Sequence, residues 1–410
     1  MATDTPNPPV GDGTDRAPSV PSVPSVPADR TGSPTVGFLE LFYDLVFVAS
    51  TMVLSNAFSE HLTWAWAGVC ALLYVLVWLL WFHTTLLMNV ERRDDFGHRT
   101  LVLAQMFLIA MTTLTFVDRE ATNNDLLGVS YGLAVLTVAA MYNRIIKKNA
   151  AAAAWARHRR NRLLIAGVLL MANTILPDWA DLIVFGFAIL LLVVPSSLGS
   201  AKRSPLPAID VHHLSERAAL LTLIMCGEAF VKVALVVSNG AVTRADVVAI
   251  VVEFIVVFAL FWTYFDDVPL AGIRSGPVFG ELWVLSHLPL QIGIVAIAIG
   301  MSKFLQVTPG HVHDEVVPIL GVGWASVYVG LALIGVFGQR RPIGPLLALR
   351  LGTAALAVLL ALLDWYIVWV EPNLFVGLLA AMTVAHTALA AGLRRGTTVV
   401  HGDDAAAAPH

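Results

Sequence analysis

Charged residues are scarce in this chain, and their scarcity excludes most soluble folds. Only 13% of the 410 residues are Asp, Glu, Lys or Arg, whereas soluble globular domains contain about 25%. Hydrophobic residues make up 57% of the chain, and the mean hydropathy is +0.76. This composition predicts a membrane protein.

The chain also has little cysteine and no concentrated basic surface. Cys70 and Cys226 both lie in apolar runs, so they offer neither a disulfide framework nor a thiolate metal site. The formal net charge is -4 and the basic residues fall mostly between apolar runs, so we expect no nucleic-acid partner. We also expect no metal and no cofactor, because there is no HxxxH or HExxH pair and no Walker A or Rossmann glycine pattern in a suitable context.

Long apolar runs dominate the sequence instead. A helix that crosses a bilayer needs about 20 residues, because each residue adds about 1.5 Å along a hydrocarbon core about 30 Å thick. We therefore predict an all-α polytopic membrane protein with about twelve transmembrane helices. The predicted spans are 38–58, 62–90, 98–117, 126–146, 160–176, 179–196, 214–239, 244–265, 278–302, 315–338, 343–364 and 373–393.

The distribution of Lys and Arg orients these spans. If the N-terminus is cytoplasmic, nineteen of the 25 basic residues fall in cytoplasmic segments or adjoining helix ends, three lie outside and three lie within spans. This asymmetry follows the positive-inside rule. The sequence thus predicts a multi-pass protein with both termini in the cytoplasm.

The chain divides into two tails and two halves. Residues 1–36 are rich in Pro and Ser and predict a disordered cytoplasmic tail, and residues 396–410 predict a second one. Between them, "ELFYDLVFVAS" from Glu40 is similar to "ERAALLTLIMCGEAF" from Glu216, and each is followed by a span rich in Trp and Phe. We predict two six-helix repeats, at 37–200 and 201–395, that are parallel because each holds an even number of spans.

Charged residues inside the predicted spans are the candidate transport or ion-binding site. A charge at mid-membrane costs at least about 2.5–3.5 kcal/mol, so such residues face the interior of a helix bundle. The candidates are Glu40, Asp44, Arg217, Glu228, Lys232 and Glu253.

Structural roles stay open beside the functional ones. Glu40 could stabilise the positive N-terminus of its helix, and Asp44 could be an ion-pair partner. Glu228 and Lys232, four residues apart, could neutralise each other within one helix. Glu253 has no cation close by in the sequence, so it is either protonated or paired with another helix.

Three histidines and one glutamine form a secondary set. His83, His98, His287 and Gln291 lie in or at the ends of predicted spans. We favour hydrogen bonding between helices for them over direct chemistry.

Two stretches resemble a known family. "VGFLELFYDLVFVAS" and "HLSERAALLTLIMCGEAFVKV" are similar to the bacterial low temperature requirement A family of membrane proteins, over residues 37–393. The second signature is an HLxER…GE pattern at His213, Glu216, Arg217, Gly227 and Glu228. The resemblance implies a protein of the bacterial cytoplasmic (inner) membrane associated with growth in the cold, and it implies no particular molecular activity.

Three function classes remain open from the sequence. The favoured one is a transporter or channel for an ion or small solute, in which Asp44 and Glu228 bind a cation or relay a proton while Arg217 and Lys232 balance their charge. An intramembrane enzyme acting on a lipid or membrane-embedded substrate would need a histidine of the secondary set beside a carboxylate. A non-catalytic, stress-related membrane factor is the third class. The lipid bilayer is the expected partner in each case, and a homo-oligomer is compatible with all three.

Overall fold

Helices make up almost all of the computed structural model. It describes residues 36–60, 63–91, 95–117, 124–196, 209–238, 244–268, 272–306, 316–339, 344–367 and 370–406. Within these ranges the only extended pairing is a single bridge between Ile273 and Gly338. The helices are α1 (Phe38–Glu60), α2 (Trp64–Val90), α3 (Phe96–Val117), α4 (Asn124–Lys148), α5 (Ala153–Ala172), α6 (Asp178–Val193), α7 (Val211–Ser238), α8 (Arg244–Phe265), α10 (Pro277–Leu285), α11 (His287–Phe304), α13 (Val317–Phe337), α14 (Gly344–Tyr366) and α15 (Pro372–Ala406), with a 3₁₀ turn η1 (Asn173–Ile175).

Nine helical segments of the described chain are long and apolar enough to cross a membrane. Twelve spans were predicted, but the helices at three of them, α5, α6 and α8, do not qualify as membrane-spanning by length and composition. Helix α5 carries four arginines within its first ten residues. Helix α6 has only 16 residues, fewer than the roughly 20 that a perpendicular span needs, and α8 carries Asp246 and Glu253 within its 22 residues.

The predicted span 278–302 is a broken helix. Helix α10 ends at Leu285 and α11 begins at His287. Pro289 has no N–H to donate to the carbonyl of Leu285, and its ring crowds that carbonyl, which accounts for the break. The hydroxyl of Ser286, at the junction, donates to the carbonyl of Leu282 at 2.7 Å. Two of the secondary candidates, His287 and Gln291, follow directly after this break.

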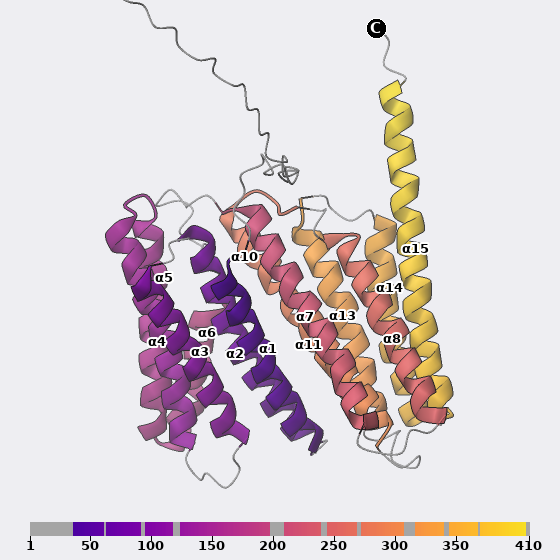
Figure 1. The fold of residues 1–410 in the computed structure, drawn as a ribbon, viewed down its shortest axis with the longest axis horizontal. Helices are drawn as coiled ribbons and strands as arrows, with labels where there is room; N and C mark the ends of the chain where they lie inside the picture. Colours follow the sequence, from indigo (N-terminus) through magenta and orange to yellow (C-terminus); the bar gives the residue numbers. More distant parts are fainter. Residues whose placement is uncertain are drawn as a thin grey trace, which may run out of the picture. The chain divides into compact units, whose positions relative to one another are not determined.

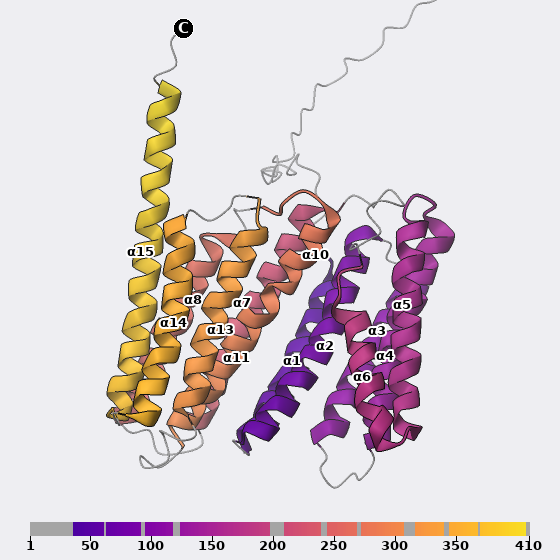
Figure 2. The same cartoon turned by 180° about the vertical axis from the view of Figure 1, so that it is seen from behind.

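The helices pack in two groups whose internal contacts follow the same order. In α1–α6, α3 contacts α1 and α4, and α5 contacts α4 and α6; in α7–α15, α11 contacts α7 and α13, and α14 contacts α13 and α15. Figure 1 shows the first group in purple shades and the second in pink to yellow, and Figure 2 shows them from behind. The groups meet where α1 and α2 contact α7 and α11. Segments far apart in the sequence thus form one interface.

Small residues allow α11 and α13 to pack closely. A Cβ added at Gly293 would lie 2.6 Å from the carbonyl oxygen of Gly323, and one added at Gly330 would lie 2.5 Å from the backbone nitrogen of Leu290. Glycine at such positions lets the backbones of membrane helices approach each other. This helix pair is the tightly packed centre of the second group.

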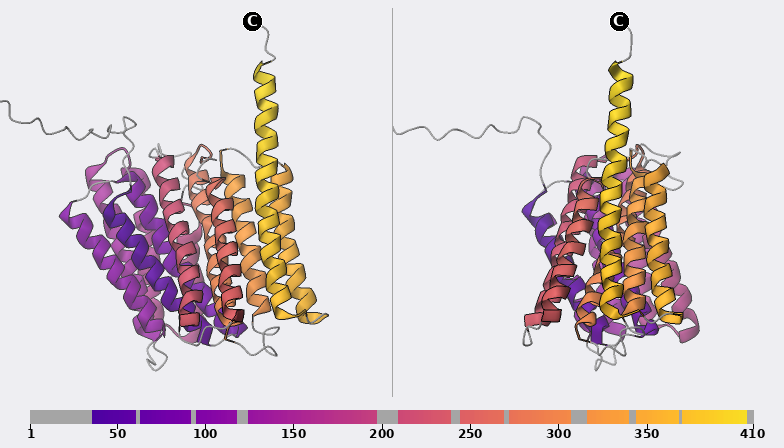
Figure 3. Two further views of the ribbon diagram at one scale, coloured as in Figure 1. Left: turned by 45° about the vertical axis from the view of Figure 1, so that its right-hand side comes forward. Right: turned by 90° about the vertical axis from the view of Figure 1, so that its right-hand side faces the viewer.

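The last helix is longer than predicted. The sequence predicted a loose tail from residue 396, but α15 continues to Ala406. Figure 3 shows this helix, in yellow, projecting beyond the ends of its neighbours. The other predicted tail, at 1–36, lies outside the described residues apart from residue 36.

Candidate functional site

Helices α1 and α7 lie next to each other and run parallel at the interface between the two groups. Near their first residues Glu40 contacts His213, and near their last residues Ser55 contacts Lys232. The sequence separations of these two pairs are 173 and 177, so the register stays nearly constant along the helices. Polar side chains from both groups therefore face each other along most of the interface.

Asp44 and Arg217 form a fully buried ion pair one turn from the first residues of this interface. Neither side chain is exposed, and the Nη2 atom of Arg217 lies 2.5 Å from Oδ1 of Asp44. The indole N–H of Trp81 donates to the same oxygen at 2.8 Å, and Nη1 of Arg217 contacts the sulfur of Met88 at 3.1 Å. Asp44 is thus an ion-pair partner, and a cation would have to compete with Arg217 for it.

A second set of contacts lies at the end of the interface where α1 and α7 begin. Oε2 of Glu40 is 3.0 Å from Nε2 of His213 and also accepts from the backbone N–H of Gly37 at 3.1 Å. Glu40 therefore caps its own helix and contacts α7 at once. The amide of Asn89 exchanges two hydrogen bonds with the backbone of Asp210, at 2.8 and 2.9 Å, which ties the last turn of α2 to the start of α7.

Lys232 is held by α1. Its ammonium group donates to Oδ1 of Asn56 at 2.6 Å and to Oγ of Ser55 at 3.1 Å. Glu228 lies one turn earlier on α7 and is only 5% exposed, and its Oε2 has no hydrogen-bond partner in the described chain. The ammonium group therefore crosses the interface to polar groups of the other helix group, and one oxygen of Glu228 is left without a donor.

Glu253 lies apart from this interface. Its helix, α8, packs against α7 and α15. The side chain has no exposed surface, and neither carboxylate oxygen has a hydrogen-bond partner among the described residues. Glu253 is therefore the most isolated of the predicted site residues. Ionising a carboxylate in such surroundings costs several kcal/mol.

The predicted histidines bond to backbone and hydroxyl groups. Nε2 of His83 is 3.0 Å from the carbonyl oxygen of Leu192 on α6. In His287, Nε2 is 3.0 Å from the hydroxyl of Tyr264 and Nδ1 is 3.0 Å from the carbonyl of Trp283. The contacts with Leu192 and Tyr264 join different helices, whereas the contact of His287 with Trp283 is local. Among the described residues, no three His, Cys, Asp or Glu side chains are placed to hold a metal ion.

His98 lies outside the interface, in a small charged cleft at the start of α3. Asp95 in this cleft pairs with Lys148, whose Nζ is 2.7 Å from Oδ2, and with Arg144. The hydrogen bond from Lys148, the backbone N–H of His98 at 2.9 Å and the charge of Arg144 hold the pKa of Asp95 well below its ordinary value. This cluster fixes the connection between α2, α3 and α4.

Two further buried contacts join the helix groups. The indole N–H of Trp78 on α2 donates to Oε1 of Gln291 on α11 at 2.7 Å. Arg159 on α5 pairs with Glu281 on α10, with both side chains almost fully buried, and the guanidinium group lies 5.0 Å from the ring centroid of Trp155. Two buried ion pairs therefore connect the groups. The α1–α6 group supplies the arginine of the Arg159–Glu281 pair and the carboxylate of the Asp44–Arg217 pair.

Sequence reasoning missed the Arg159–Glu281 pair. Arg159 lies just before the predicted span 160–176, and Glu281 lies inside the predicted span 278–302 but is not among the predicted site residues. The in-span acid was the signal that could have found it. A third buried arginine, Arg350 on α14, pairs with Asp267 within the second group.

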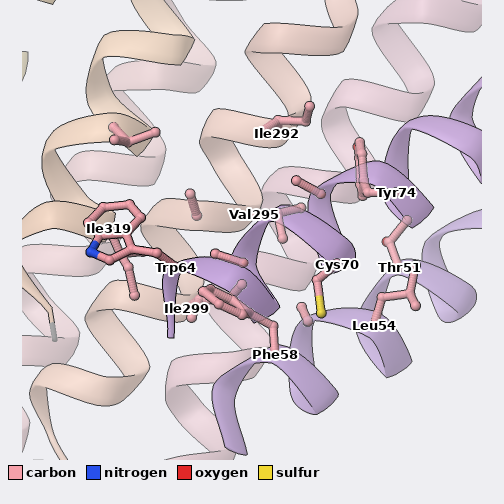
Figure 4. Close-up of a pocket in the computed structure, with 15 residues that line it drawn as sticks. Thr51, Leu54, Phe58, Trp64, Cys70, Tyr74, Ile292, Val295, Ile299 and Ile319 are labelled. Carbon is pink, nitrogen blue, oxygen red and sulfur yellow. The ribbon is translucent and has the colours of Figure 1, made fainter. Parts of the chain in front are cut away.

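A cavity of about 150 Å³ lies between the groups, beside the Lys232 end of the interface. It is lined by side chains of α1, α2, α11 and α13, among them Thr51 and Tyr74 (Figure 4), and Ser55 is a further lining residue. Ser55 therefore borders the cavity while it accepts the hydrogen bond from Lys232. The polar interface and an apolar cavity meet at this serine.

Comparison with known proteins gives two matches. The sequence model of a family described as "Bacterial low temperature requirement A protein (LtrA)" matches residues 35–395. An uncharacterized protein of Rhizobium meliloti (strain 1021) is 24% identical over 288 residues, which cover 66% of this chain and 70% of that protein. Both matches extend well beyond the two stretches that first suggested the resemblance.

Proposed function

The chain belongs to the bacterial low temperature requirement A family, and we propose that it is a membrane transporter that moves an ion or small solute along the interface between α1 and α7. The transported species reaches the interface at one membrane face and leaves it at the other. Glu228 binds the cation or proton that is moved or that drives the movement.

The observation that carries this proposal is the placement of Glu228. It is buried on α7 between Met225, which contacts Thr51 of α1, and Lys232, which contacts Ser55 of α1. Its Oε2 has no hydrogen-bond donor among the described residues. Carboxylates within membrane helices are rare and line ion or proton pathways. Sites between two similar halves near the middle of the membrane are a common design of transporters.

Asp44 has a different role in this proposal from the one first expected of it. Arg217 and Trp81 bond to Oδ1 of Asp44, and its Oδ2 has no hydrogen-bond partner in the described chain. Because the adjacent guanidinium group already balances the charge of this carboxylate, Asp44 serves as part of a gate in this proposal and not as the cation ligand. The Asp44–Arg217 and Arg159–Glu281 pairs hold the groups together toward one membrane face, and they must separate when the path opens to that face.

We also propose that the helices form two parallel six-helix repeats. The equivalent order of contacts in α1–α6 and α7–α15, with α10 and α11 counted as one broken span, supports this arrangement. Helices α5, α6 and α8 then cross the bilayer as short or charged spans, which local thinning of the bilayer accommodates. The repeats would lie in the cytoplasmic membrane with both termini inside, as the distribution of Lys and Arg indicates.

Flux measurements in proteoliposomes test the transport proposal. Internal pyranine reports proton movement under a potassium diffusion potential, and separate arms replace the driving gradient with sodium or potassium alone. We expect flux with the wild type, loss of flux with Glu228→Gln, and unchanged flux with Asp95→Asn, which removes a carboxylate outside the interface. Wild-type liposomes no more permeable than empty ones, or full flux with Glu228→Gln, would refute the proposal.

The contacts of two histidines support transport over the enzyme hypothesis in this proposal. That hypothesis needs a histidine of the secondary set beside a carboxylate, whereas His83 and His287 bond to a carbonyl and a tyrosine hydroxyl. His98 does share a cleft with Asp95, but that cleft lies outside the α1–α7 interface and Asp95 is paired with Lys148. His213 contacts the carboxylate of Glu40 within the α1–α7 interface. In the transport proposal this pair lies at the mouth of the path.

A further inference from the structure

We propose that the cavity between α1, α2, α11 and α13 binds one acyl chain of a bilayer lipid. This inference does not depend on transport, because it concerns binding at a site that needs no turnover. The cavity's chemistry, its size and the direction of its opening each support it.

The side chains that line the cavity are mainly apolar. Of the fifteen lining residues, most are Ala, Leu, Ile, Val or aromatic. The hydroxyls of Thr51 and Ser55 donate to carbonyls of their own helix, Val48 at 2.8 Å and Met52 at 3.0 Å. These two hydroxyl protons are therefore already used. Tyr74 also lines the cavity, and its hydroxyl has no hydrogen-bond partner in the described chain; the rest of the lining is mainly hydrocarbon.

The cavity is large enough for only part of a lipid molecule. Its volume is about 150 Å³, and an apolar cavity of about this volume stays free of water and holds a benzene-sized group. Sites for whole drug-sized ligands are larger, about 300–1,000 Å³. The occupant is thus a short apolar segment whose remainder stays outside, as the end of a lipid chain would.

The opening faces the hydrocarbon region sideways. Three lining residues are exposed on the surface of the bundle: Trp64 at the start of α2, and Ala71 and Val322 within their helices. Ala71 is seven residues from the start of α2, which places it about 10 Å from that end at about 1.5 Å per residue. A chain in the surrounding bilayer can therefore enter at this depth without crossing water.

An aromatic pair lies at the end of the cavity nearest the helix termini. Trp64, the first residue of α2, lines the cavity (Figure 4), and its ring centroid is 6.2 Å from that of Trp365 near the end of α14. Tryptophan is enriched at membrane–water interfaces. These rings cover the water-facing end, so the sideways opening is the route for an apolar chain.

Photocrosslinking tests the proposal with the full-length protein in nanodiscs. The probe is a phosphatidylglycerol that carries a diazirine near the end of one acyl chain, and adducts are mapped by mass spectrometry. We expect adducts in peptides covering 64–74 and 292–299 in excess over those on other lipid-facing helices. The bulky substitution Ala71→Trp at the mouth should reduce this labelling at least fivefold, and Ala67→Phe is a second variant should the first fail to fold.

The matched control is Ala355→Trp, which adds the same bulk at an exposed position of α14 and should leave labelling of the cavity unchanged. Labelling spread evenly over all lipid-facing helices would overturn the proposal, as would labelling insensitive to both cavity variants. Labelling by a small free diazirine probe but not by the lipid would overturn the assignment to an acyl chain. Glu228→Gln, which tests transport, should retain the labelling, so the two proposals can fail separately.

Discussion

Replacing Asp44 with asparagine should strongly destabilise the protein. The substitution keeps the shape of the side chain but removes the negative charge that lies 2.5 Å from the guanidinium group of Arg217, and neither side chain is exposed to solvent. Among the described residues, the remaining ion-pair partner of the buried Arg217 is then Glu40, whose Oε1 is 4.0 Å away.

The magnitude follows from two estimates that agree. Two unit charges about 4 Å apart interact by about 4 kcal/mol at an effective dielectric constant of about 20. Removing one partner of a buried ion pair costs about 3–5 kcal/mol in measured cases. Because Glu40 retains part of the compensation, we expect Asp44→Asn to lower the free energy of unfolding by about 3 kcal/mol.

Unfolding in mixed micelles with increasing SDS, followed by tryptophan fluorescence, measures this change. The double variant Asp44→Asn/Arg217→Gln should be more stable than Asp44→Asn, because neutralising both partners leaves no uncompensated charge. A loss for Asp44→Asn within about 1 kcal/mol, the range of exposed ion pairs, would refute the reasoning. So would a double variant no more stable than the single one.

Three further predictions concern other parts of the fold. Arg159→Gln should destabilise by about 3–5 kcal/mol in the same assay, because it strands the buried carboxylate of Glu281; an unchanged midpoint would show that the pair does not hold the groups together. Gly293→Ala should lower the free energy of unfolding by about 1–3 kcal/mol through overpacking, because its Cβ would lie 2.6 Å from a backbone oxygen. The control Gly186→Ala should be near neutral, because its Cβ would meet nothing within 4 Å. Equal effects of the two substitutions would contradict the close packing of α11 and α13. Asp95→Asn should lower the thermal unfolding temperature equally at pH 5 and pH 8. The folded-state pKa of Asp95 lies well below its ordinary value, so its ion pairs contribute full stability above about pH 3.9. This stability is lost only as the pH falls toward the folded-state pKa. A gap that closes between pH 8 and pH 5 would contradict this.

Local sequence patterns predicted the helices well. Each of the twelve predicted spans overlaps a helix, because an apolar run in a membrane must satisfy its own backbone hydrogen bonds. The apolar pattern did not show which of these helices are long and apolar enough to cross a membrane. Helix α5 carries four arginines near its start, and α6 is only 16 residues long. The break between α10 and α11 at Pro289 was readable in principle, since a proline inside a helical pattern disrupts it.

The partners of the candidate site residues could not be read in the same way. The spacing of Glu228 and Lys232 suggested a pair within one helix, but the ammonium group of Lys232 donates to Ser55 and Asn56 of another helix. Helical spacing fixes only which side chains share a face. It does not fix which face of another helix lies opposite.

The sequence by itself determined that this chain is a helical membrane protein of a known family, and that Asp44, Arg217 and Glu228 are costly enough in the membrane to need interior positions. The helical membrane character and the interior positions follow from composition and from hydrocarbon as a solvent, which act locally along the chain; the family follows from the similarity of residues 35–395 to its sequence model. Only the tertiary structure decided that Asp44 meets Arg217, that Glu228 keeps an oxygen without a donor, and that an apolar cavity opens beside Ser55. These facts depend on the packing of helices that lie more than 170 residues apart in the sequence, and no local pattern encodes that packing.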